Sequence, residues 1–284
     1  NLILGDRDEA FASALAASHM NIINAHIHGG DKSKAGIDEY NRHAITKISN
    51  LHFAATKKSQ KRIIKMGENP KFVFFTGSPS IDDVIKQNFT SKKHLEKKFK
   101  INFKGDEIIL LQHSVTTETE KTEIEILNTL NAILKTNKIT IAIAPNSDAG
   151  NKQIYDNILN FSENHEFITM FKNLPRTDFL GLLNNCGVLV GNSSSGIIEA
   201  SYFNIPVINI GIRQNDREHG SNVININSNV DSIYSAIQKA LKSKTKNANK
   251  KKILYGNGNA SKKIVKILEK TDLNKELLQK QIFY

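Results

Sequence analysis

The chain has 284 residues, of which 39% are hydrophobic and 24% are charged, and its formal net charge is +11. This length is enough for two domains of ordinary size. No apolar run approaches the roughly 20 residues of a membrane-spanning helix, so we expect no membrane association. The lysines are spread widely, with one cluster at residues 242–252, and no nucleic-acid-binding motif accompanies them. We therefore interpret the charge as a solvated surface that attracts a small anion, not a nucleic acid.

Two further features bear on the setting of the protein. Its only cysteine, Cys186, excludes an internal disulfide and favours a reducing, cytoplasmic compartment. The surrounding sequence, LLNNCGVLV, is apolar, so we expect a buried thiol and not a nucleophile. The sequence begins with Asn1 inside an expected strand, and we expect an N-terminal portion to precede it.

Short apolar runs alternate with amphipathic stretches over residues 1–88, and this alternation predicts a doubly wound parallel sheet. The expected strands are residues 1–4, 21–27, 51–55 and 72–75, and the expected helices are residues 9–18, 40–48, 57–66 and 81–86. A polar, lysine-rich stretch follows at residues 87–106, where we place a domain boundary.

Expected strands and helices alternate again after this boundary. Expected strands cover residues 108–111, 139–144, 167–171, 188–190 and 207–210, and expected helices cover residues 123–135, 153–163, 177–185, 197–203 and 232–242. A Lys/Asn-rich linker then leads to two terminal helices, residues 260–269 and 274–281. The predicted organisation is thus a first α/β domain over residues 1–90, a second over residues 105–255, and terminal helices over residues 256–284.

The stretch from residue 23 to residue 47 carries the densest group of ionisable residues. His28 and Asp31 flank a glycine pair directly after an apolar run, and Asp38 and Glu39 precede a helical run that carries Arg42. The two acidic residues could simply cap the helix. However, ligands of open α/β sheets bind beyond the carboxyl ends of the strands, where this stretch is expected to lie. We therefore interpret it as part of a functional site.

Two other strand ends carry candidate residues. Asp6 follows the first expected strand, where it could instead be a helix N-cap. His113 follows the strand at residues 108–112, at the carboxyl end that would face a cleft.

The sequence Gly191-Asn192-Ser193-Ser194-Ser195-Gly196 predicts a phosphate-binding loop. It follows an expected strand and opens an expected helix, so backbone N–H groups and hydroxyls could both donate to an anion. Glu199, one turn later, could accept hydrogen bonds from the vicinal hydroxyls of a ribose. The alternative is an ordinary serine-rich turn.

Loops at residues 145–150 and 211–217 also follow expected strands and add polar side chains to the same edge of the sheet. Their candidate ligand-binding residues are Asn146, Asp148, Arg213, Gln214 and Arg217. Arginines in such loops suit bidentate pairing with phosphate.

Together these motifs resemble the UDP-N-acetylglucosamine 2-epimerase family, and most closely its hydrolysing branch of the sialic and legionaminic acid pathways. The matching segments are GDR at Gly5, AHIHGGD at Ala25, DEYNRHAITK at Asp38, TGSP at Thr76, PNSDAG at Pro145, GNSSSGIIEA at Gly191, PVINIGIRQ at Pro206 and YGNGNAS at Tyr255. They occur in order over nearly the whole chain. The resemblance implies a glycosyltransferase-B-like fold of two Rossmann-like domains, the first incomplete at its N-terminus, with terminal helices that return toward it.

The resemblance also implies an activity. A UDP-linked 2-acetamido sugar would lose its C2 proton and UDP to form a glycal, and hydration would release the free 2-epimeric sugar. This chemistry requires two proton carriers with different environments. Asp6 and Asp38 match catalytic positions of the family, Glu39 is a neighbour that could replace Asp38, and His113 matches a histidine near the diphosphate. Ser193, Ser194, Ser195 and Gly196 match the phosphate loop, Glu199 the ribose contact, and Phe179 a residue near the uracil.

One position departs from the family pattern. Where many relatives carry Glu in an H-x-E-x-G sequence, this chain has His28, so either His28 or Asp31 could transfer the proton. The resemblance implies a homo-oligomer, a dimer or tetramer, with no metal and no cofactor. A non-hydrolysing 2-epimerase and a UDP-sugar-dependent glycosyltransferase of the same fold are the alternatives. The motifs do not distinguish N-acetylglucosamine from a 2,4-diacetamido sugar.

Overall fold

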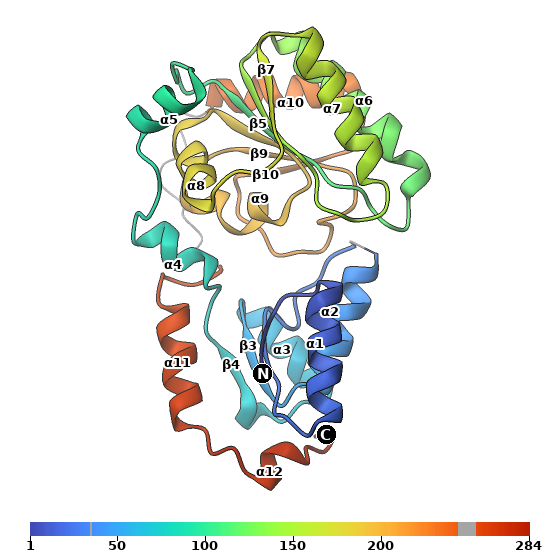
Figure 1. Ribbon diagram of the computed structural model, residues 1–284, viewed down its shortest axis with the longest axis vertical. Helices are drawn as coiled ribbons and strands as arrows, with labels where there is room; N and C mark the ends of the chain where they lie inside the picture. Colours follow the sequence, from blue (N-terminus) through green and yellow to red (C-terminus); the bar gives the residue numbers. More distant parts are fainter. Residues whose placement is uncertain (35, 244–253) are drawn as a thin grey trace. The chain divides into compact units, whose positions relative to one another are not determined.

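The computed structural model describes residues 1–34, 36–243 and 254–284, which form two α/β units. Unit 1 comprises Asn1–Lys86 and Ile253–Tyr284, and unit 2 comprises Gln87–Lys252 (Figure 1). Most of the lysine cluster at residues 242–252, and with it the expected Lys/Asn linker, lies outside the described residues.

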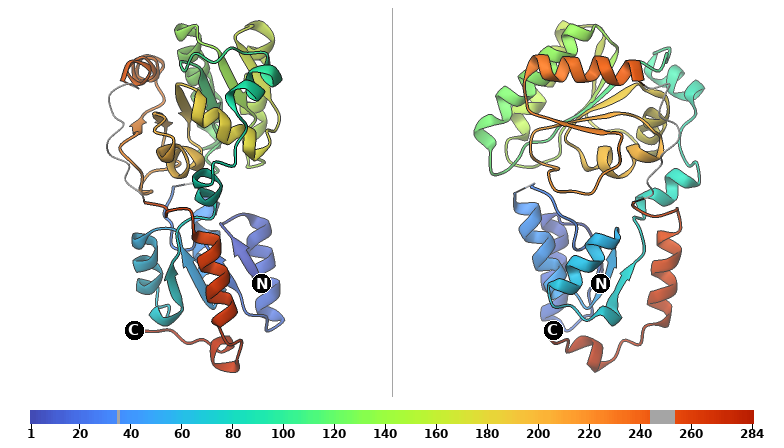
Figure 2. Two further views of the ribbon diagram at one scale, coloured as in Figure 1. Left: turned by 90° about the vertical axis from the view of Figure 1, so that its left-hand side faces the viewer. Right: turned by 180° about the vertical axis from the view of Figure 1, so that it is seen from behind.

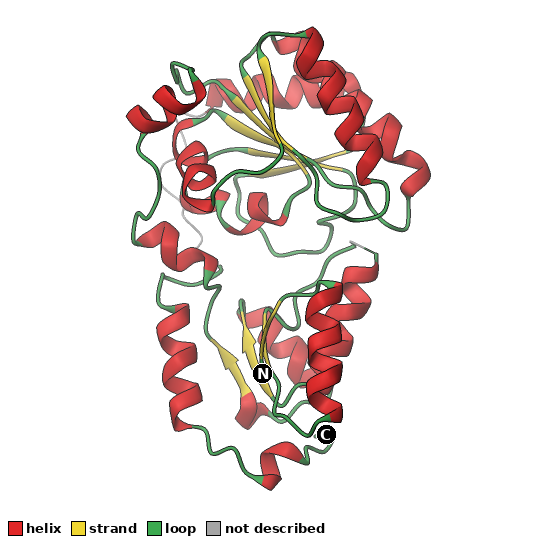
Figure 3. Cartoon of the chain, in the orientation of Figure 1, coloured by secondary structure: helices red, strands yellow, loops and turns green. Residues whose placement is uncertain are grey.

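The sheet of unit 1 has four parallel strands in sequence order. They are β1 (Leu2–Leu4), β2 (Ala25–Ile27), β3 (Leu51–Ala54) and β4 (Val73–Phe75). The helices α1 (Asp8–His19), α2 (Ile37–Ile48) and α3 (Lys57–Lys65) connect these strands, and α4 (Ser80–Ile85) follows the last of them (Figure 3). Because all four strands are parallel, their carboxyl ends lie along one edge of the sheet.

Apolar residues cover this sheet on both faces. On one face Ile3 packs with Ala14 of α1 and Ile45 of α2. On the other face a cluster of strand residues packs against the C-terminal helices α11 (Ala260–Lys270) and α12 (Lys275–Leu278), as Figure 2 shows. That cluster contains Ala25, Ile27, Leu51, Phe53, Ile264 and Leu277. The end of the chain therefore completes the core of the unit that contains its beginning.

The sheet of unit 2 has six parallel strands in the order β10-β9-β8-β5-β6-β7. The strands are β5 (Ile108–Leu111), β6 (Thr140–Ile143), β7 (Ile168–Phe171), β8 (Val188–Gly191), β9 (Val207–Ile210) and β10 (Val223–Ile226). The chain runs outward in one direction from β5 and then restarts on its other side at β8. Ligands of doubly wound sheets bind at such a switch point.

Helices on one face of this sheet share a single apolar core with the strands. They are α6 (Thr122–Thr136), α7 (Asn151–Asn164) and α10 (Val230–Ser243). The remaining helices of unit 2 are α5 (Lys92–Phe99), α8 (Arg176–Asn185) and α9 (Ser194–Ile198). Gly181 permits close packing of α8 on the chain around α5, because a Cβ atom there would lie 2.5 Å from the carbonyl oxygen of Thr90.

The α/β class with two parallel sheets is as predicted, but several element boundaries were wrong. The expected strand at residues 21–27 begins only at Ala25, because Asn24 turns its side-chain amide back to the carbonyl of Ala14 on α1. The expected helix at residues 197–203 is the five-residue α9 followed by a 3₁₀ turn at Ala200–Tyr202. The expected helix at residues 274–281 is the short α12.

Two elements were not predicted. The lysine-rich boundary stretch contains α5, whose Leu95 and Phe99 are buried four residues apart. Beyond β9, residues Val223–Ile226 (VINI) form the edge strand β10. This strand was not predicted because its apolar run is short and lies among asparagines. Cys186 is buried, as expected. Within the described ranges, every helix is too short or too polar to cross a lipid bilayer.

Candidate active site

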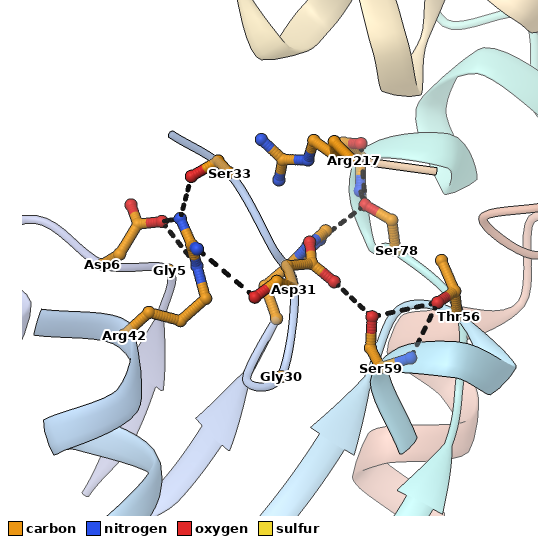
Figure 4. Close-up of polar contacts among 12 residues, drawn as sticks. Gly5, Asp6, Gly30, Asp31, Ser33, Arg42, Thr56, Ser59, Ser78 and Arg217 are labelled. Atoms are coloured by element: carbon orange, nitrogen blue, oxygen red, sulfur yellow. Dashed lines mark hydrogen bonds and ion pairs between the residues drawn. The ribbon is translucent and has the colours of Figure 1, made fainter. Parts of the chain in front are cut away.

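Polar residues gather where the four strands of unit 1 end (Figure 4). Asp6 follows β1, Asp31 follows β2, Ser59 lies on the helix after β3, and Ser78 follows β4. Every strand of the sheet therefore contributes to one cluster, which we call the acid cluster.

Arg42 on α2 organises one half of the acid cluster. Its side chain is only 2% exposed, and its Nε atom donates to the Asp6 carboxylate over 2.9 Å, while its Nη2 atom contacts the same oxygen. Its Nη1 atom contacts Glu39, and Nη2 also donates to the Ser33 hydroxyl over 3.2 Å. One buried guanidinium thus holds two carboxylates, each of which is still more than a fifth exposed. Arginine suits this arrangement because its donors are held in a fixed planar fork.

Glu39 remains ionised in this setting. Burial alone would raise the pKa of Glu39, but the hydrogen bond from His43 and the charge of Arg42 outweigh burial and hold the pKa below its ordinary value. The backbone N–H of Ser33 also donates to this carboxylate, over 2.9 Å. Glu39 therefore anchors the loop before α2 in addition to pairing with Arg42.

His28 and Asp31 form the other half of the acid cluster. The His28 Nδ1 atom lies 3.0 Å from the Asp31 carboxylate, and its Nε2 atom lies 2.9 Å from the Ser78 hydroxyl. The second Asp31 oxygen accepts a hydrogen bond from Ser59 over 2.7 Å. Gly30 makes this turn possible, because it has a φ of +70° and a Cβ atom would lie 2.5 Å from the Ser59 carbonyl. His28 and Asp31, which the sequence presented as alternative proton carriers, are therefore hydrogen-bonded to each other.

A further histidine, His26, holds the turn at Asp6 through a hydrogen bond to its neighbour Gly5. The Nε2 atom of His26 lies 2.8 Å from the carbonyl of Gly5, and its Nδ1 atom lies 3.2 Å from the Thr46 hydroxyl. Burial lowers the pKa of His26 to about 4, so the ring is neutral at neutral pH. A neutral ring donates to the Gly5 carbonyl without adding a charge beside Asp6.

Five of the predicted residues of unit 1 are therefore together in one network, namely Asp6, His28, Asp31, Glu39 and Arg42. Asp38 is buried in the first turn of α2, which begins at Ile37 and not after Glu39 as predicted. Sequence analysis missed the residues that connect the network: His26, Ser33, Ser59 and Ser78. Serines after strands are too common for their position alone to identify them.

In unit 2, Asn192 connects two strands at the switch point. Its side chain accepts from the His113 N–H over 2.7 Å and donates to the His113 carbonyl over 2.9 Å. The Nδ1 atom of His113 in turn accepts from the backbone N–H of Asn146, over 3.1 Å. The loops after β5, β6 and β8 are thus joined around His113.

The loop after β9 joins the same group through two further predicted residues. Gln214 donates to the carbonyl of Asn192 over 3.0 Å, and Arg213 lies 3.7 Å from the carboxylate of Asp148. Arg217 donates to Gln214 over 3.2 Å. The predicted polar residues of the β6 and β9 loops therefore lie at one edge of this sheet.

The expected phosphate loop is compact. The Ser193 hydroxyl caps α9 by accepting from the Ser195 N–H, and the two hydroxyls lie 2.8 Å apart. Ser194 and Gly196 are in α9 itself, which is too short to present a full helix dipole. Glu199 is buried and pairs with Arg176 on α8 over 3.2 Å, and Phe179 lies half-buried on the same helix.

No group of three or more His, Cys, Asp or Glu side chains with the arrangement of a metal site occurs in the described part of the chain. The acid cluster is instead built from charge pairs and hydroxyls.

The chain is similar to known proteins in both sequence and fold. A family model described as UDP-N-acetylglucosamine 2-epimerase matches residues 2–269. The chain belongs to this family. Its sequence is 37% identical over 280 residues to a UDP-N,N'-diacetylbacillosamine 2-epimerase (hydrolyzing) of Legionella pneumophila, covering 98% of this chain and 73% of that protein. It is 34% identical over 241 residues to a GDP/UDP-N,N'-diacetylbacillosamine 2-epimerase (hydrolyzing) of Campylobacter jejuni, covering 84% and 62%.

The fold has a close counterpart in a crystal structure of UDP-GlcNAc 2-epimerase from Neisseria meningitidis bound to UDP-GlcNAc. The TM-score is 0.79 at 22% identity, over 95% of this chain and 76% of that one. The comparisons confirm the predicted family and glycosyltransferase-B-like fold class. The names of the two relatives agree with the prediction of a hydrolysing epimerase and not with the glycosyltransferase alternative.

Proposed function

We propose that the chain is a hydrolysing 2-epimerase of UDP-linked 2-acetamido sugars, in which unit 1 supplies the proton-transfer groups and unit 2 binds UDP. The observation that carries this proposal is the acid cluster, which joins Asp6, Glu39 and the His28–Asp31 pair at the carboxyl edge of one sheet. A transferase that leaves C2 untouched has no need of such a set of proton carriers.

The proposed reaction begins with removal of the C2 proton by a group of the acid cluster. The electrons of the C2–H bond form a C1=C2 double bond while the C1–O bond breaks, and UDP leaves with that bonding pair. Water then adds to the glycal: its oxygen bonds to C1, and a proton reaches C2 from the opposite face. The products are UDP and a free sugar inverted at C2.

Two groups of the acid cluster are suited to the two proton transfers. Asp6 is partly exposed, is oriented by its pair with Arg42, and offers a carboxylate that can accept a proton. The His28–Asp31 pair is more buried and offers an imidazole, the side chain most often used in general acid–base catalysis. We assign Asp6 to one face of the sugar and the His28–Asp31 pair to the other, with Asp38 and Glu39 supporting the loop between them.

Unit 2 provides donors for the nucleotide. His113 and the loop Ser193–Gly196 are proposed to contact the diphosphate, and Glu199 to accept from the ribose hydroxyls, with Phe179 near the uracil. Arg213, Gln214 and Arg217 keep the β9 loop in place beside them. Hydrogen bonds from neutral donors stabilise a diphosphate without a metal ion.

The names of the relatives favour a 2,4-diacetamido sugar over N-acetylglucosamine as the substrate, and hence a place in the synthesis of sialic-acid-like sugars. The proposal also includes a homo-oligomeric, cytoplasmic enzyme, a dimer or tetramer. Sedimentation equilibrium of the purified chain measures that assembly directly.

Turnover in deuterated water tests the reaction. The purified chain is incubated separately with UDP-N-acetylglucosamine and with a UDP-2,4-diacetamido sugar, and the products are followed by NMR. We expect free UDP and a free 2-epimeric sugar with deuterium at C2. Interconversion of two UDP-sugars would indicate the non-hydrolysing reaction, and release of a sugar that keeps its C2 proton would overturn the proposal.

A further inference from the structure

We propose that Ser78 is a positioning residue for His28, an inference that rests on the proposed function and adds a residue to it. Ser78 follows β4, its side chain is fully buried, and its hydroxyl lies 2.9 Å from the Nε2 atom of His28 (Figure 4). A buried hydroxyl hydrogen-bonded to a ring nitrogen restricts the rotation of the ring.

The protonation pattern follows from the partners. A carboxylate only accepts hydrogen bonds, so the Nδ1 atom of His28 carries the proton that faces Asp31. The Nε2 atom of the neutral ring then carries a lone pair, and the Ser78 hydroxyl must donate to it. Ser78 can receive in turn from Ser80, whose hydroxyl lies 2.8 Å away. The hydrogen bonds therefore run in one direction from Ser80 through Ser78 and His28 to Asp31.

This chain of donors has a consequence for proton transfer. Both nitrogens of His28 are engaged, so a proton reaches Nε2 only as the Ser78 hydroxyl gives up or exchanges its own. Without Ser78, Asp31 still holds the proton of Nδ1, but the lone pair of Nε2 loses its donor. The ring then keeps only one of the two contacts that fix its rotation, and Nε2 has no hydroxyl with which to exchange a proton.

The backbone of Ser78 is fixed by the C-terminal segment. Its N–H donates to the carbonyl of the buried Tyr255 over 2.7 Å. Gly77 allows the two segments to approach, because it has a φ of +88° and a Cβ atom would lie 2.9 Å from that carbonyl and from the Cα atom of Gly256. The position of Ser78, and through it the orientation of His28, therefore depends on a segment almost 180 residues after Ser78 in the chain.

The direct test is the Ser78→Ala variant, which removes the hydroxyl and with it the contacts to His28 and Ser80. We expect kcat to fall by about 10- to 100-fold, at the lower end of general acid–base effects, while KM and UDP affinity stay within about twofold. Ser49→Ala is the matched control, because Ser49 is also a fully buried serine of unit 1 and, among the described residues, its hydroxyl bonds only to the Ile45 carbonyl on α2. Its kcat should equal that of the unaltered chain.

A double-mutant cycle tests whether Ser78 affects turnover through His28 or through another residue. His28 has a φ of +69°, which asparagine tolerates well, and asparagine is too short to reach Ser78, so His28→Asn breaks the contact with little backbone strain. In the His28→Asn background, Ser78→Ala should change kcat by less than twofold. A full additional loss in that background, or a Ser78→Ala variant with unaltered kcat, would show that Ser78 does not act through His28.

Nitrogen NMR of histidine-labelled protein gives a readout that needs no turnover. The His28 signals are assigned from their absence in His28→Asn. We expect an Nδ1–H tautomer in both proteins, because Asp31 is present in both, and a shifted Nε2 resonance in Ser78→Ala, because Nε2 loses its hydrogen-bond donor. An unchanged Nε2 resonance in that variant overturns the proposal. If the chain releases no sugar from either UDP-sugar, the proposed function fails, while the NMR result still decides the role of Ser78.

Discussion

The two units hold their candidate residues by different means. In the acid cluster of unit 1, charged side chains are held by other charged side chains, with Arg42 between Asp6 and Glu39 and His28 against Asp31. In unit 2, the loops around His113 are joined mainly through the amide side chains of Asn192 and Gln214 and through backbone groups. Unit 2 also contains two ion pairs, Arg213–Asp148 and Arg176–Glu199. Several carboxylates paired with a cation or a histidine suit a site that moves protons, whereas a larger share of neutral donors suits a site that binds an anion without protonating it.

The contrast predicts that turnover and nucleotide binding can be separated. Asp6→Asn keeps the shape of the side chain but removes its titrating carboxylate, so turnover should fall by about 10²–10⁴-fold. UDP affinity measured by calorimetry should remain within about twofold, because the proposed nucleotide residues all belong to unit 2. A parallel loss of UDP affinity would argue against this division of roles.

The charge pairs of unit 1 should also dominate its stability. Arg42→Met removes the shared partner of Asp6 and Glu39 and leaves two carboxylates facing each other, so we expect a loss of about 2–4 kcal/mol. Urea unfolding measures this loss. In unit 2, Gln214→Leu removes a neutral hydrogen bond and should cost only about 1 kcal/mol. Equal losses in the two variants would contradict the comparison.

Unit 1 should be the more acid-sensitive unit because of its buried histidine. His26 has a pKa of about 4 in the fold against 6.5 for an ordinary histidine. The unfolded chain therefore binds a proton that the folded chain does not, and the stability contributed by the neutral ring is complete above pH 6.5 and is lost as the pH falls toward 4. The expected loss is roughly 2–3 kcal/mol at pH 4.

Urea unfolding measures this contribution of His26 to stability. The unaltered chain and His26→Gln are compared at several pH values between 7 and 4. Glutamine stays neutral and can still donate to the Gly5 carbonyl, so the variant should lose less stability across this range. The same pH dependence in both proteins would show that His26 is not the responsible group.

The smallest expected effect is on UDP binding. Glu199→Gln keeps the shape of the side chain but removes the charge that pairs with Arg176 and is proposed to accept from the ribose, so UDP affinity should fall by about 1–2 kcal/mol. Turnover at saturating substrate should be nearly unchanged. The control Arg176→Met removes one partner of Glu199 and leaves the Glu199 carboxylate in place, so calorimetry with UDP should show a smaller loss than for Glu199→Gln.

A good part of this architecture could be predicted from the sequence. Nine strands were located from their apolar runs, because burial on both faces of a parallel sheet requires continuous hydrophobic residues. The elements that were missed, α5 and β10, lie at the edges of unit 2, where fewer positions are buried and the apolar pattern is weak. Asp6, His28 and Asp31 became candidates because ionisable residues are unusual at a strand end, and Glu39 and Arg42 because they follow in the same dense stretch of ionisable residues.

The sequence by itself determined which residues are candidates for the chemistry and which family the chain belongs to. Only the tertiary structure decided how those residues are paired. His28 and Asp31 are three positions apart and could be viewed as alternatives, yet the turn at Gly30 makes them partners. Ser78 lies fifty residues from His28 and is brought to it because parallel strands place their carboxyl ends together. Contacts of this kind depend on strand order and on close packing of backbones, which no local pattern of residues records.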